Sequence, residues 1–132
     1  MEKNYKEYLN QINTFVFDVD GVLTDGSIQI STQGELLRTM NIKDGYALKA
    51  AKNAGFTVCI ISGGKNEGVR KRLRDLGITD IYLGIHDKVE QMDELAEVKE
   101  ISKYVSHKKG GKGCVRDVIE QVMKVQGKWI DK

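Results

Sequence analysis

Two aspartates one residue apart, Asp18 and Asp20, are the residues of this chain best suited to chemistry. They follow a short apolar run, residues 14–17, and Gly21 comes directly after them. The run is typical of a buried strand, and the glycine of its end. Carboxylate oxygens at a strand end can hold a hard cation such as Mg²⁺, which commonly bridges a carboxylate to a substrate phosphate. The same pair could supply a nucleophile and a proton carrier.

Each part of this pattern also has a plain structural explanation. An Asp-Gly pair after a strand suits an ordinary turn with solvated carboxylates, and short motifs give false matches. An EF-hand is excluded, because the glycine directly follows the second aspartate, where that loop needs a further acidic or amide residue. Neither 62–65 nor 110–113 has the spacing of a P-loop. His86 and His107 have no partners at zinc spacing, and we expect both at the surface.

Alternating strand and helix patterns supply the scaffold. Strands are predicted at 13–19, 56–61 and 78–83, with a short extended piece at 103–106, and helices at 2–12, 46–53, 65–76, from about 88, and 115–124. This order predicts an α/β fold, a Rossmann-like parallel sheet with helices on both faces. Residues 27–31 and 35–40, across a turn at 32–34, predict a β-hairpin that hangs over the aspartates as a flap.

Polar residues follow each of the three predicted strands. Asp18 and Asp20 follow the first strand, Ser62 with Gly63 follows the second, and residues ending in Lys88 follow the third. Because the carboxyl ends of parallel strands meet at one edge of a sheet, we expect these groups to converge there. That convergence favours a functional site over two structural explanations, in which Ser62 is a helix N-cap and Lys88 a charge at a helix start.

A phosphate monoester suits this set of groups. Asp18 can attack phosphorus and form an aspartyl-phosphate, and Asp20 can protonate the leaving alcohol and then deprotonate water. Mg²⁺ between the Asp18 carboxylate and a phosphoryl oxygen would neutralise charge. Ser62 and nearby backbone N–H groups can hold other oxygens, and Lys88 adds a positive charge. The sequence therefore predicts phosphoryl transfer, which depends mainly on positioning and charge neutralisation.

Length and composition limit the class of protein. At 132 residues a single domain spanning 1–132 is expected. With 21 basic and 19 acidic residues, nothing indicates a nucleic-acid partner. Two cysteines make no disulfide framework and fit reduced thiols in a cytoplasmic protein. We expect neither a signal peptide nor a membrane span.

The ordered motifs resemble the haloacid dehalogenase superfamily of phosphatases. Residues 18–22 (DVDGV) resemble its first motif, Ser62 its second and Lys88 its third. Over nearly the whole chain the likeness narrows to the capless 3-deoxy-D-manno-octulosonate 8-phosphate phosphatases. That group includes nonulosonate 9-phosphate phosphatases and a domain fused to some acylneuraminate cytidylyltransferases. The stretches that carry the likeness are 20–26 (DGVLTDG), 43–45 (KDG), 61–63 (ISG) and 108–117 (KKGGKGCVRD).

This resemblance implies a Mg²⁺-dependent phosphatase of a phosphorylated sugar acid, as in lipopolysaccharide biosynthesis, that assembles as a homotetramer. The hairpins of four subunits would meet centrally, and the tail loop would reach a neighbour's active site. The resemblance further implies catalysis by Asp18, Asp20 and Lys88, metal binding by Asp18 and Asp20, and substrate binding by Thr24, Lys43, Ser62, Gly63, Gly110, Gly111 and Arg116.

One motif of the resembled family is missing from the sequence. Its fourth motif, an acidic Gly-Asp-Asp whose first Asp completes the metal site, has no match before the tail. The gap corresponds to one strand-helix unit of about 30 residues. A segment absent from the sequence, a natural or engineered deletion, or replacement by Asp93, Glu94 or Glu97 would each explain it, although a helix aims these three poorly. The alternative function is a catalytically impaired relative that binds a phospho-ligand or serves in oligomerisation.

Overall fold

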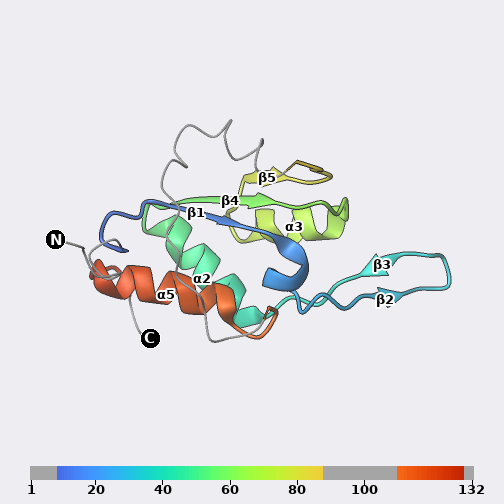
Figure 1. Cartoon of the computed structure of the whole chain (residues 1–132), viewed down its shortest axis with the longest axis horizontal. Coiled ribbons are helices and arrows are strands. Elements are labelled where there is room, and N and C mark those ends of the chain that lie inside the picture. The colour runs from blue at the N-terminus through green and yellow to red at the C-terminus, as the bar shows by residue number, and fades with distance from the viewer. Residues whose placement is uncertain (1–8, 88–109, 130–132) are drawn as a thin grey trace.

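The main sheet of the protein has three parallel strands in the order β1-β4-β5 (Figure 1). The computed structural model describes residues 9–87 and 110–129. The strands are β1 (Thr14–Phe17), β4 (Thr57–Ile61) and β5 (Asp80–Tyr82). In the register of the sheet, Thr14 pairs with Thr57 and Ile60 pairs with Ile81. The predicted α/β fold with a parallel sheet flanked by helices is confirmed, while the presence of helices on both faces stays a prediction, because the described helices cover one face.

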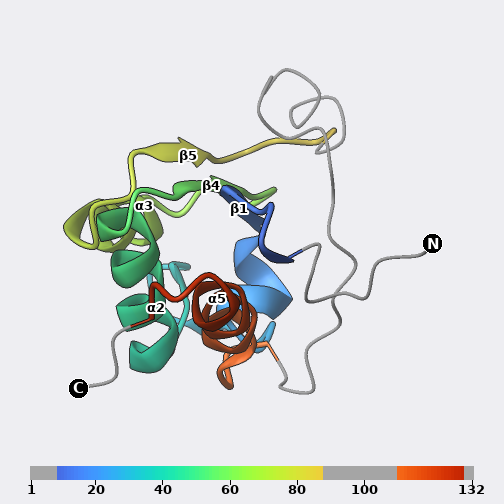
Figure 2. The same cartoon turned by 90° about the vertical axis from the view of Figure 1, so that its left-hand side faces the viewer.

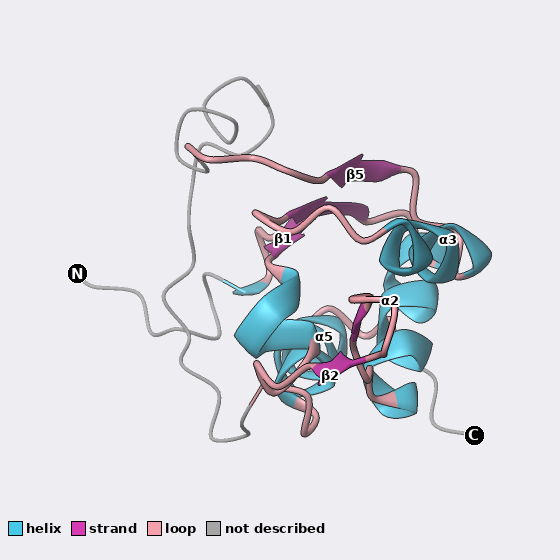
Figure 3. Cartoon of the chain, turned by 90° about the vertical axis from the view of Figure 1, so that its right-hand side faces the viewer, coloured by secondary structure: helices cyan, strands magenta, loops and turns pink. Residues whose placement is uncertain are grey.

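Three described helices lie on the same side of this sheet (Figures 2 and 3). They are α2 (Ile42–Asn53), α3 (Glu67–Asp75) and α5 (Cys114–Val125). α2 and α3 are the crossovers that make successive strands parallel, and α5 packs along α2. The helix expected from about residue 88, the extended piece at 103–106 and most of the helix expected at 2–12 lie outside the described residues. Within the described ranges, no helix combines the length and apolar character of a membrane span.

The space between the sheet and the helices is filled by apolar side chains. The fully buried ones include Leu23, Leu48, Val58, Ile60, Leu73, Ile78, Ile119 and Met123. β4 is buried along nearly its whole length, as a central strand of a parallel sheet should be. Each such side chain contributes about 1.5–3 kcal/mol when it leaves water, so this layer fixes the strand ends that carry the polar residues.

α2 and α3 both begin at asparagine caps. Asn41 Oδ1 accepts the N–H groups of Lys43 at 2.8 Å and Asp44 at 3.3 Å, so α2 begins at Ile42. The predicted start at residue 46 is therefore wrong, because it omits this capped first turn. Asn66 Oδ1 caps the first turn of α3 in the same way, at 3.0 Å from its N–H partner.

The predicted hairpin is present and extends away from the sheet (Figure 1). Its antiparallel strands, β2 (Gln29–Ile30) and β3 (Leu36–Leu37), are shorter than predicted. The apolar side chains of Ile28, Ile30, Leu36 and Leu37 are exposed. The body of the subunit therefore leaves much of the hairpin uncovered, while the residues after β3 return toward the carboxyl edge of the sheet.

Candidate active site

The chain leaves β1 through a tight segment, residues 18–24, which we name the aspartate turn. β1 ends at Phe17 rather than at the predicted residue 19, because Val19–Leu23, labelled η1, form a tight turn in which the backbone of Asp20 and Gly21 is not helical and the Thr24 N–H donates to the Val19 carbonyl at 3.0 Å. Asp18 holds the start of this turn, since its Oδ1 accepts the Val19 N–H at 2.7 Å. Asp18 is half-buried at the strand end, whereas Asp20 is exposed. The two carboxylates thus sit in different surroundings although they are two residues apart.

Thr24 holds the aspartate turn closed. Its side chain is fully buried, and its hydroxyl accepts the N–H groups of Gly21 at 3.3 Å and Gly26 at 3.2 Å. Gly21 has a φ of +85°, a conformation that favours glycine. The resemblance implies substrate binding by Thr24, but in the structure its oxygen binds the backbone of the turn itself.

Ser62 and Asp20 meet beside Gly64. Ser62 follows β4 and is 2% exposed, and its Oγ accepts the Gly64 N–H at 3.2 Å. A Cβ atom on Gly64 would lie 3.7 Å from Ser62 Oγ and 3.6 Å from Asp20 Oδ2. Gly63, between them in the chain, is exposed. Two of the predicted polar groups therefore lie together at this edge, while the third ends at Lys88, outside the described residues.

Arg38, at the base of the hairpin, holds the Asp20 carboxylate. Its Nε donates to Asp20 Oδ1 at 2.8 Å and its Nη2 to Oδ2 at 3.2 Å, the forked geometry that arginine makes with carboxylates. Hydrogen bonding to Asp20 raises the pKa of Arg38 above its ordinary value. Arg38 is a residue of the site that was not predicted from the sequence, although a basic residue in a hairpin expected to hang over two acids was a usable signal.

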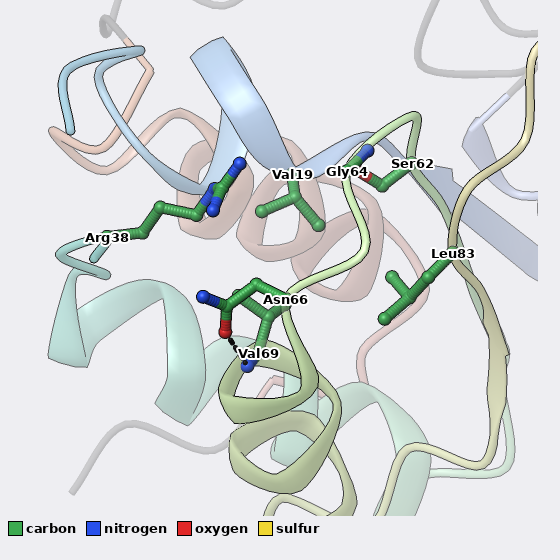
Figure 4. Close-up of a pocket in the computed structure, with 7 residues that line it drawn as sticks. All are labelled: Val19, Arg38, Ser62, Gly64, Asn66, Val69 and Leu83. Atoms are coloured by element: carbon green, nitrogen blue, oxygen red, sulfur yellow. Dashed lines mark hydrogen bonds between the residues drawn. The ribbon is translucent and has the colours of Figure 1, made fainter. Parts of the chain in front are cut away.

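Arg38 and Ser62 line one small pocket (Figure 4). Its lining comes from the aspartate turn, the base of the hairpin, the segment between β4 and α3, and the segment after β5; the residues are Val19, Arg38, Ser62, Gly64, Asn66, Val69 and Leu83. The pocket therefore combines the polar side chains of Arg38, Ser62 and Asn66 with apolar ones.

Residues 110–113, which we name the glycine loop, lie against the aspartate turn of the same chain. The Gly111 N–H donates to the Val22 carbonyl at 3.0 Å. A Cβ on Gly110 would overlap the Gly21 carbonyl, and a Cβ on Gly111 would lie 2.5 Å from the Asp25 nitrogen. Neither position therefore has room for a side chain. The resemblance implies that both glycines bind substrate; the structure gives them a close backbone contact within their own subunit.

Asp44 ties α2 to the start of α5. It is fully buried, and its Oδ1 accepts the Arg116 N–H at 2.9 Å. Burial raises the pKa of Asp44 above its ordinary value, against the opposing effect of backbone N–H bonds from Arg116 and Gly113. Asp44 thus caps α5, whose N-cap Gly113 has no side chain to do so. Its neighbour Lys43, implied to bind substrate, is exposed on the first turn of α2.

Arg116 is held by two aromatic rings and an acid of its own chain. Its guanidinium carbon lies 5.8 Å from the ring centre of Tyr46 and 5.3 Å from that of Trp129. Its Nε lies 3.3 Å from Glu120 Oε2, one helical turn along α5. The resemblance implies that Arg116 binds substrate. In the structure its side chain contacts Tyr46, Trp129 and Glu120 of the same subunit.

The carboxylates at the strand end are ligands of the type that Mg²⁺ prefers. Mg²⁺ takes oxygen ligands and usually keeps several waters beside one or two carboxylates. Asp18 and Asp20 supply two carboxylates, and each oxygen that accepts one N–H keeps a further lone pair. In the part of the chain that the structure describes, no group of three or more His, Cys, Asp or Glu side chains could hold a metal. A third acidic ligand is therefore not among these residues.

A search of known proteins found close sequence relatives. The 3-deoxy-D-manno-octulosonate 8-phosphate phosphatase KdsC of Salmonella typhi is 30% identical over 154 residues, which span 89% of this chain and 82% of the relative. The chain belongs to the 3-deoxy-D-manno-octulosonate 8-phosphate phosphatase family. This family of the haloacid dehalogenase superfamily consists of phosphoric monoester hydrolases, so the chain is an enzyme of that class by family. No family profile matches the chain.

Solved structures agree with the family assignment. A Vibrio cholerae protein proposed to be such a phosphatase superposes with a TM-score of 0.87 at 30% identity, covering 100% of this chain and 94% of its own. The enzyme of Moraxella catarrhalis superposes with a TM-score of 0.81 at 27% identity, over 93% of this chain and 92% of its own. The Moraxella structure contains a magnesium ion, a phosphate ion and a 3-deoxy-D-manno-octulosonate molecule. A further matching structure, of the Haemophilus influenzae enzyme, is the cobalt-bound form, so these solved relatives bind divalent metal ions.

The alignment with the Salmonella phosphatase leaves part of the relative unmatched. It runs over 154 residues but uses 89% of a 132-residue chain, so several tens of positions of the relative have no counterpart here. Their number is similar to the size of one strand-helix unit, about 30 residues, which is the size of the stretch that the sequence predicts to be missing with the fourth motif.

Proposed function

We propose that this phosphatase hydrolyses the phosphate ester of a small sugar acid with Mg²⁺ as cofactor. The first candidate substrate is 3-deoxy-D-manno-octulosonate 8-phosphate, which the names of its relatives carry, and the second is a nonulosonate 9-phosphate. The observation that carries the proposal is the meeting of Asp20 and Ser62 beside Gly64, at the end of the strand that carries Asp18. In this proposal Asp18 is the nucleophile, Asp20 carries the proton and Ser62 holds the phosphate.

The reaction follows from these three groups. An Asp18 oxygen attacks phosphorus, the bond from phosphorus to the sugar oxygen breaks, and Asp20 gives its proton to that oxygen. Water then attacks the aspartyl-phosphate, Asp20 takes the proton of that water, and phosphate leaves with the Asp18 carboxylate restored. Ser62 Oγ and the N–H groups beside it hold the non-reacting oxygens. Asp18 and Asp20 would hold Mg²⁺, which would supply neutralisation of the phosphoryl charge. Lys88 is proposed to add a fixed positive charge.

A second candidate is a family member that binds phosphorylated ligands without turning them over. The gap in the alignment and the absence of a three-acid metal cluster within the described residues favour it. A weaker metal site would lose most of the charge neutralisation that phosphoryl transfer requires. The first candidate stands ahead because Asp20 and Ser62 both lie beside Gly64, at the end of the strand that Asp18 follows.

The assembly of the protein belongs to the same proposal. The exposed apolar residues of the hairpin, Ile28, Ile30, Leu36 and Leu37, suit contacts between subunits, which supports the homotetramer implied by the resemblance. Substrate contacts by Lys43, Gly63, the glycine loop and Arg116, the single domain and the cytoplasmic location stay predictions.

Phosphate release tests the proposal. We expect Mg²⁺-dependent hydrolysis of the two sugar-acid phosphates in preference to glucose 6-phosphate, which lacks a carboxylate, and loss of hydrolysis in EDTA. Asp18→Asn should lower turnover at least about a thousandfold, because the nucleophile is gone. Asp25→Asn is the matched control, since Asp25 is an exposed acid of the same motif that bonds Ser27. Wild-type turnover by Asp18→Asn would overturn the mechanism, and an inactive wild type that still binds beryllium fluoride with Mg²⁺ would favour the second candidate.

A further inference from the structure

Arg38 and Asp20 form an ion pair of unequal exposure. The Arg38 side chain is 11% exposed, whereas that of Asp20 is 40% exposed. Both oxygens of Asp20 are engaged, by Nε at 2.8 Å and by Nη2 at 3.2 Å. The packed partner of the pair is therefore the arginine, and the carboxylate that it holds is the more accessible partner.

Arg38 is itself fixed by the base of the hairpin and the start of α3. Its Nη1 donates to the Leu36 carbonyl at 3.2 Å, and Asn66 Nδ2 donates to the same carbonyl at 2.8 Å. Asn66 Oδ1 at the same time caps α3. Figure 4 shows Arg38 reaching toward Val19 of the aspartate turn, with Asn66 below it. The guanidinium is thus tied to the structural body rather than free to follow the carboxylate.

Gly64 adds a steric limit at the same place. A Cβ on Gly64 would lie 3.2 Å from Arg38 Nη2, closer than ordinary contact. The ion pair therefore lies close to Ser62, the proposed phosphate holder. An aspartate side chain without such a contact samples several rotamers, and misplacement of a reacting group by about 1 Å can lower a rate about a hundredfold.

We propose that Arg38 is a positioning residue of this enzyme, which fixes the Asp20 carboxylate toward the oxygen of the leaving group. This inference rests on the proposed function, because it takes Asp20 as the proton carrier. Each Asp20 oxygen keeps a second lone pair, so Asp20 can carry a proton while Arg38 holds it. Arg38 then acts through Asp20, and its removal should matter most where the leaving group needs a proton.

Two esters of similar shape separate this role from others. Benzyl phosphate leaves as an alkoxide and needs protonation, whereas p-nitrophenyl phosphate leaves as a stable phenolate and does not. Neither ester contains a sugar, so a contact between Arg38 and the sugar cannot mimic the result. The constant kcat/KM reports the steps up to release of the alcohol, which is where Asp20 would act as an acid.

The experiment measures kcat/KM for both esters with Mg²⁺ in wild type, Arg38→Met and Arg38→Lys. For Arg38→Met we expect a loss of about ten- to a hundredfold with benzyl phosphate, a part of what a general acid contributes, and less than about threefold with p-nitrophenyl phosphate. Arg38→Lys should recover part of the loss, and it carries the test if Arg38→Met does not fold. Arg70→Met is the matched control, since Arg70 also bonds an acid, Glu67 at 3.0 Å, and a carbonyl, that of Ile81 at 3.3 Å; it should change neither value.

Equal losses with the two esters would overturn the inference, because a phosphate-binding or merely structural arginine would affect both. No loss with either ester would overturn it as well. A wild-type chain that hydrolyses no ester at all would overturn the proposed function and the inference with it, and that result is distinct from the other two.

Discussion

The hairpin and the glycine loop both hold the aspartate turn, but by different means. The hairpin uses one charged side chain, Arg38, whose partner Asp20 remains 40% exposed. The glycine loop uses bare backbone: Gly111 bonds Val22 at 3.0 Å, and the backbone at Gly110 lies against Gly21. The first contact is made by side chains and leaves the carboxylate accessible, whereas the second is close-packed backbone. The turn is thus held on its backbone by the glycine loop and at the group that would move the proton by Arg38.

Among the substitutions that test this difference, Gly111→Ala is expected to cause the largest loss of stability. Gly111 has a φ of +70°, and a Cβ there would lie 2.5 Å from the Asp25 nitrogen and 2.7 Å from the Thr24 carbonyl carbon. Overpacking against backbone destabilises by about 1–3 kcal/mol, and the left-handed conformation adds about 1 kcal/mol. We expect Gly111→Ala to lower the free energy of unfolding in urea by about 2–4 kcal/mol and to impair hydrolysis.

Gly127→Ala is a matched control for that substitution. Gly127 has nearly the same φ, +71°, but within the described residues nothing lies within 4 Å of its added Cβ. It should show the backbone strain alone, about 1 kcal/mol, with hydrolysis unchanged. Equal losses of stability in the two variants would contradict the close contact between the glycine loop and the aspartate turn.

A smaller effect is expected at Asp44, which anchors the end of the glycine loop. Asp44→Ala removes the cap of α5, worth about 1 kcal/mol. Asp44→Asn keeps an acceptor for the Arg116 N–H but cannot ionise. Urea unfolding of wild type, Asp44→Ala and Asp44→Asn would rank them. A loss in Asp44→Ala below about 0.3 kcal/mol would contradict the capping role.

The pH dependence of stability also tests Asp44. Burial raises its pKa above the ordinary value of 3.8, so the folded state binds this proton more tightly than the unfolded state. The stabilisation is complete below the unfolded pKa and is lost as pH rises through the folded pKa. The unfolding free energy of wild type minus that of Asp44→Asn should therefore fall as pH rises from about 3.5 toward neutrality. A difference that grows with pH would contradict the direction of the shift.

The smallest effect is expected at Arg116, whose contacts differ from those of Arg38. Arg116 contacts Tyr46, Trp129 and Glu120, whereas Arg38 contacts an acid of the site. Arg116→Met should lower the unfolding free energy by about 0.5–1 kcal/mol, the contribution of an exposed cation–π contact. With Arg116 committed to these partners, we expect KM to stay within about twofold of wild type, well under the tenfold that 1.4 kcal/mol of binding energy would give. A large rise in KM would instead support the substrate contact that the resemblance implies.

The sequence predicted those features that follow from local pattern. Apolar runs with terminal glycines predicted β1, β4 and β5, and the alternation of strand and helix predicted that Asp20 and Ser62 would meet at one edge. The first turn of α2 was missed because Asn41 was not used as a cap. Arg38 could not be paired from the sequence, since its acid lies 18 residues away and only the return of the hairpin brings them together. The contact between Gly110 and Gly21 likewise depends on how α5 packs on α2.

The most direct test of the account is a search for the covalent intermediate on Asp18. Wild-type protein turning over 3-deoxy-D-manno-octulosonate 8-phosphate with Mg²⁺ would be quenched in acid, and the peptide containing residues 14–26 would be examined by mass spectrometry. The account predicts one added phosphoryl group on Asp18, absent without Mg²⁺ and absent in Asp18→Asn. Turnover by a chain whose Asp18 never carries that group, or a phosphoryl group found on another residue, would contradict it.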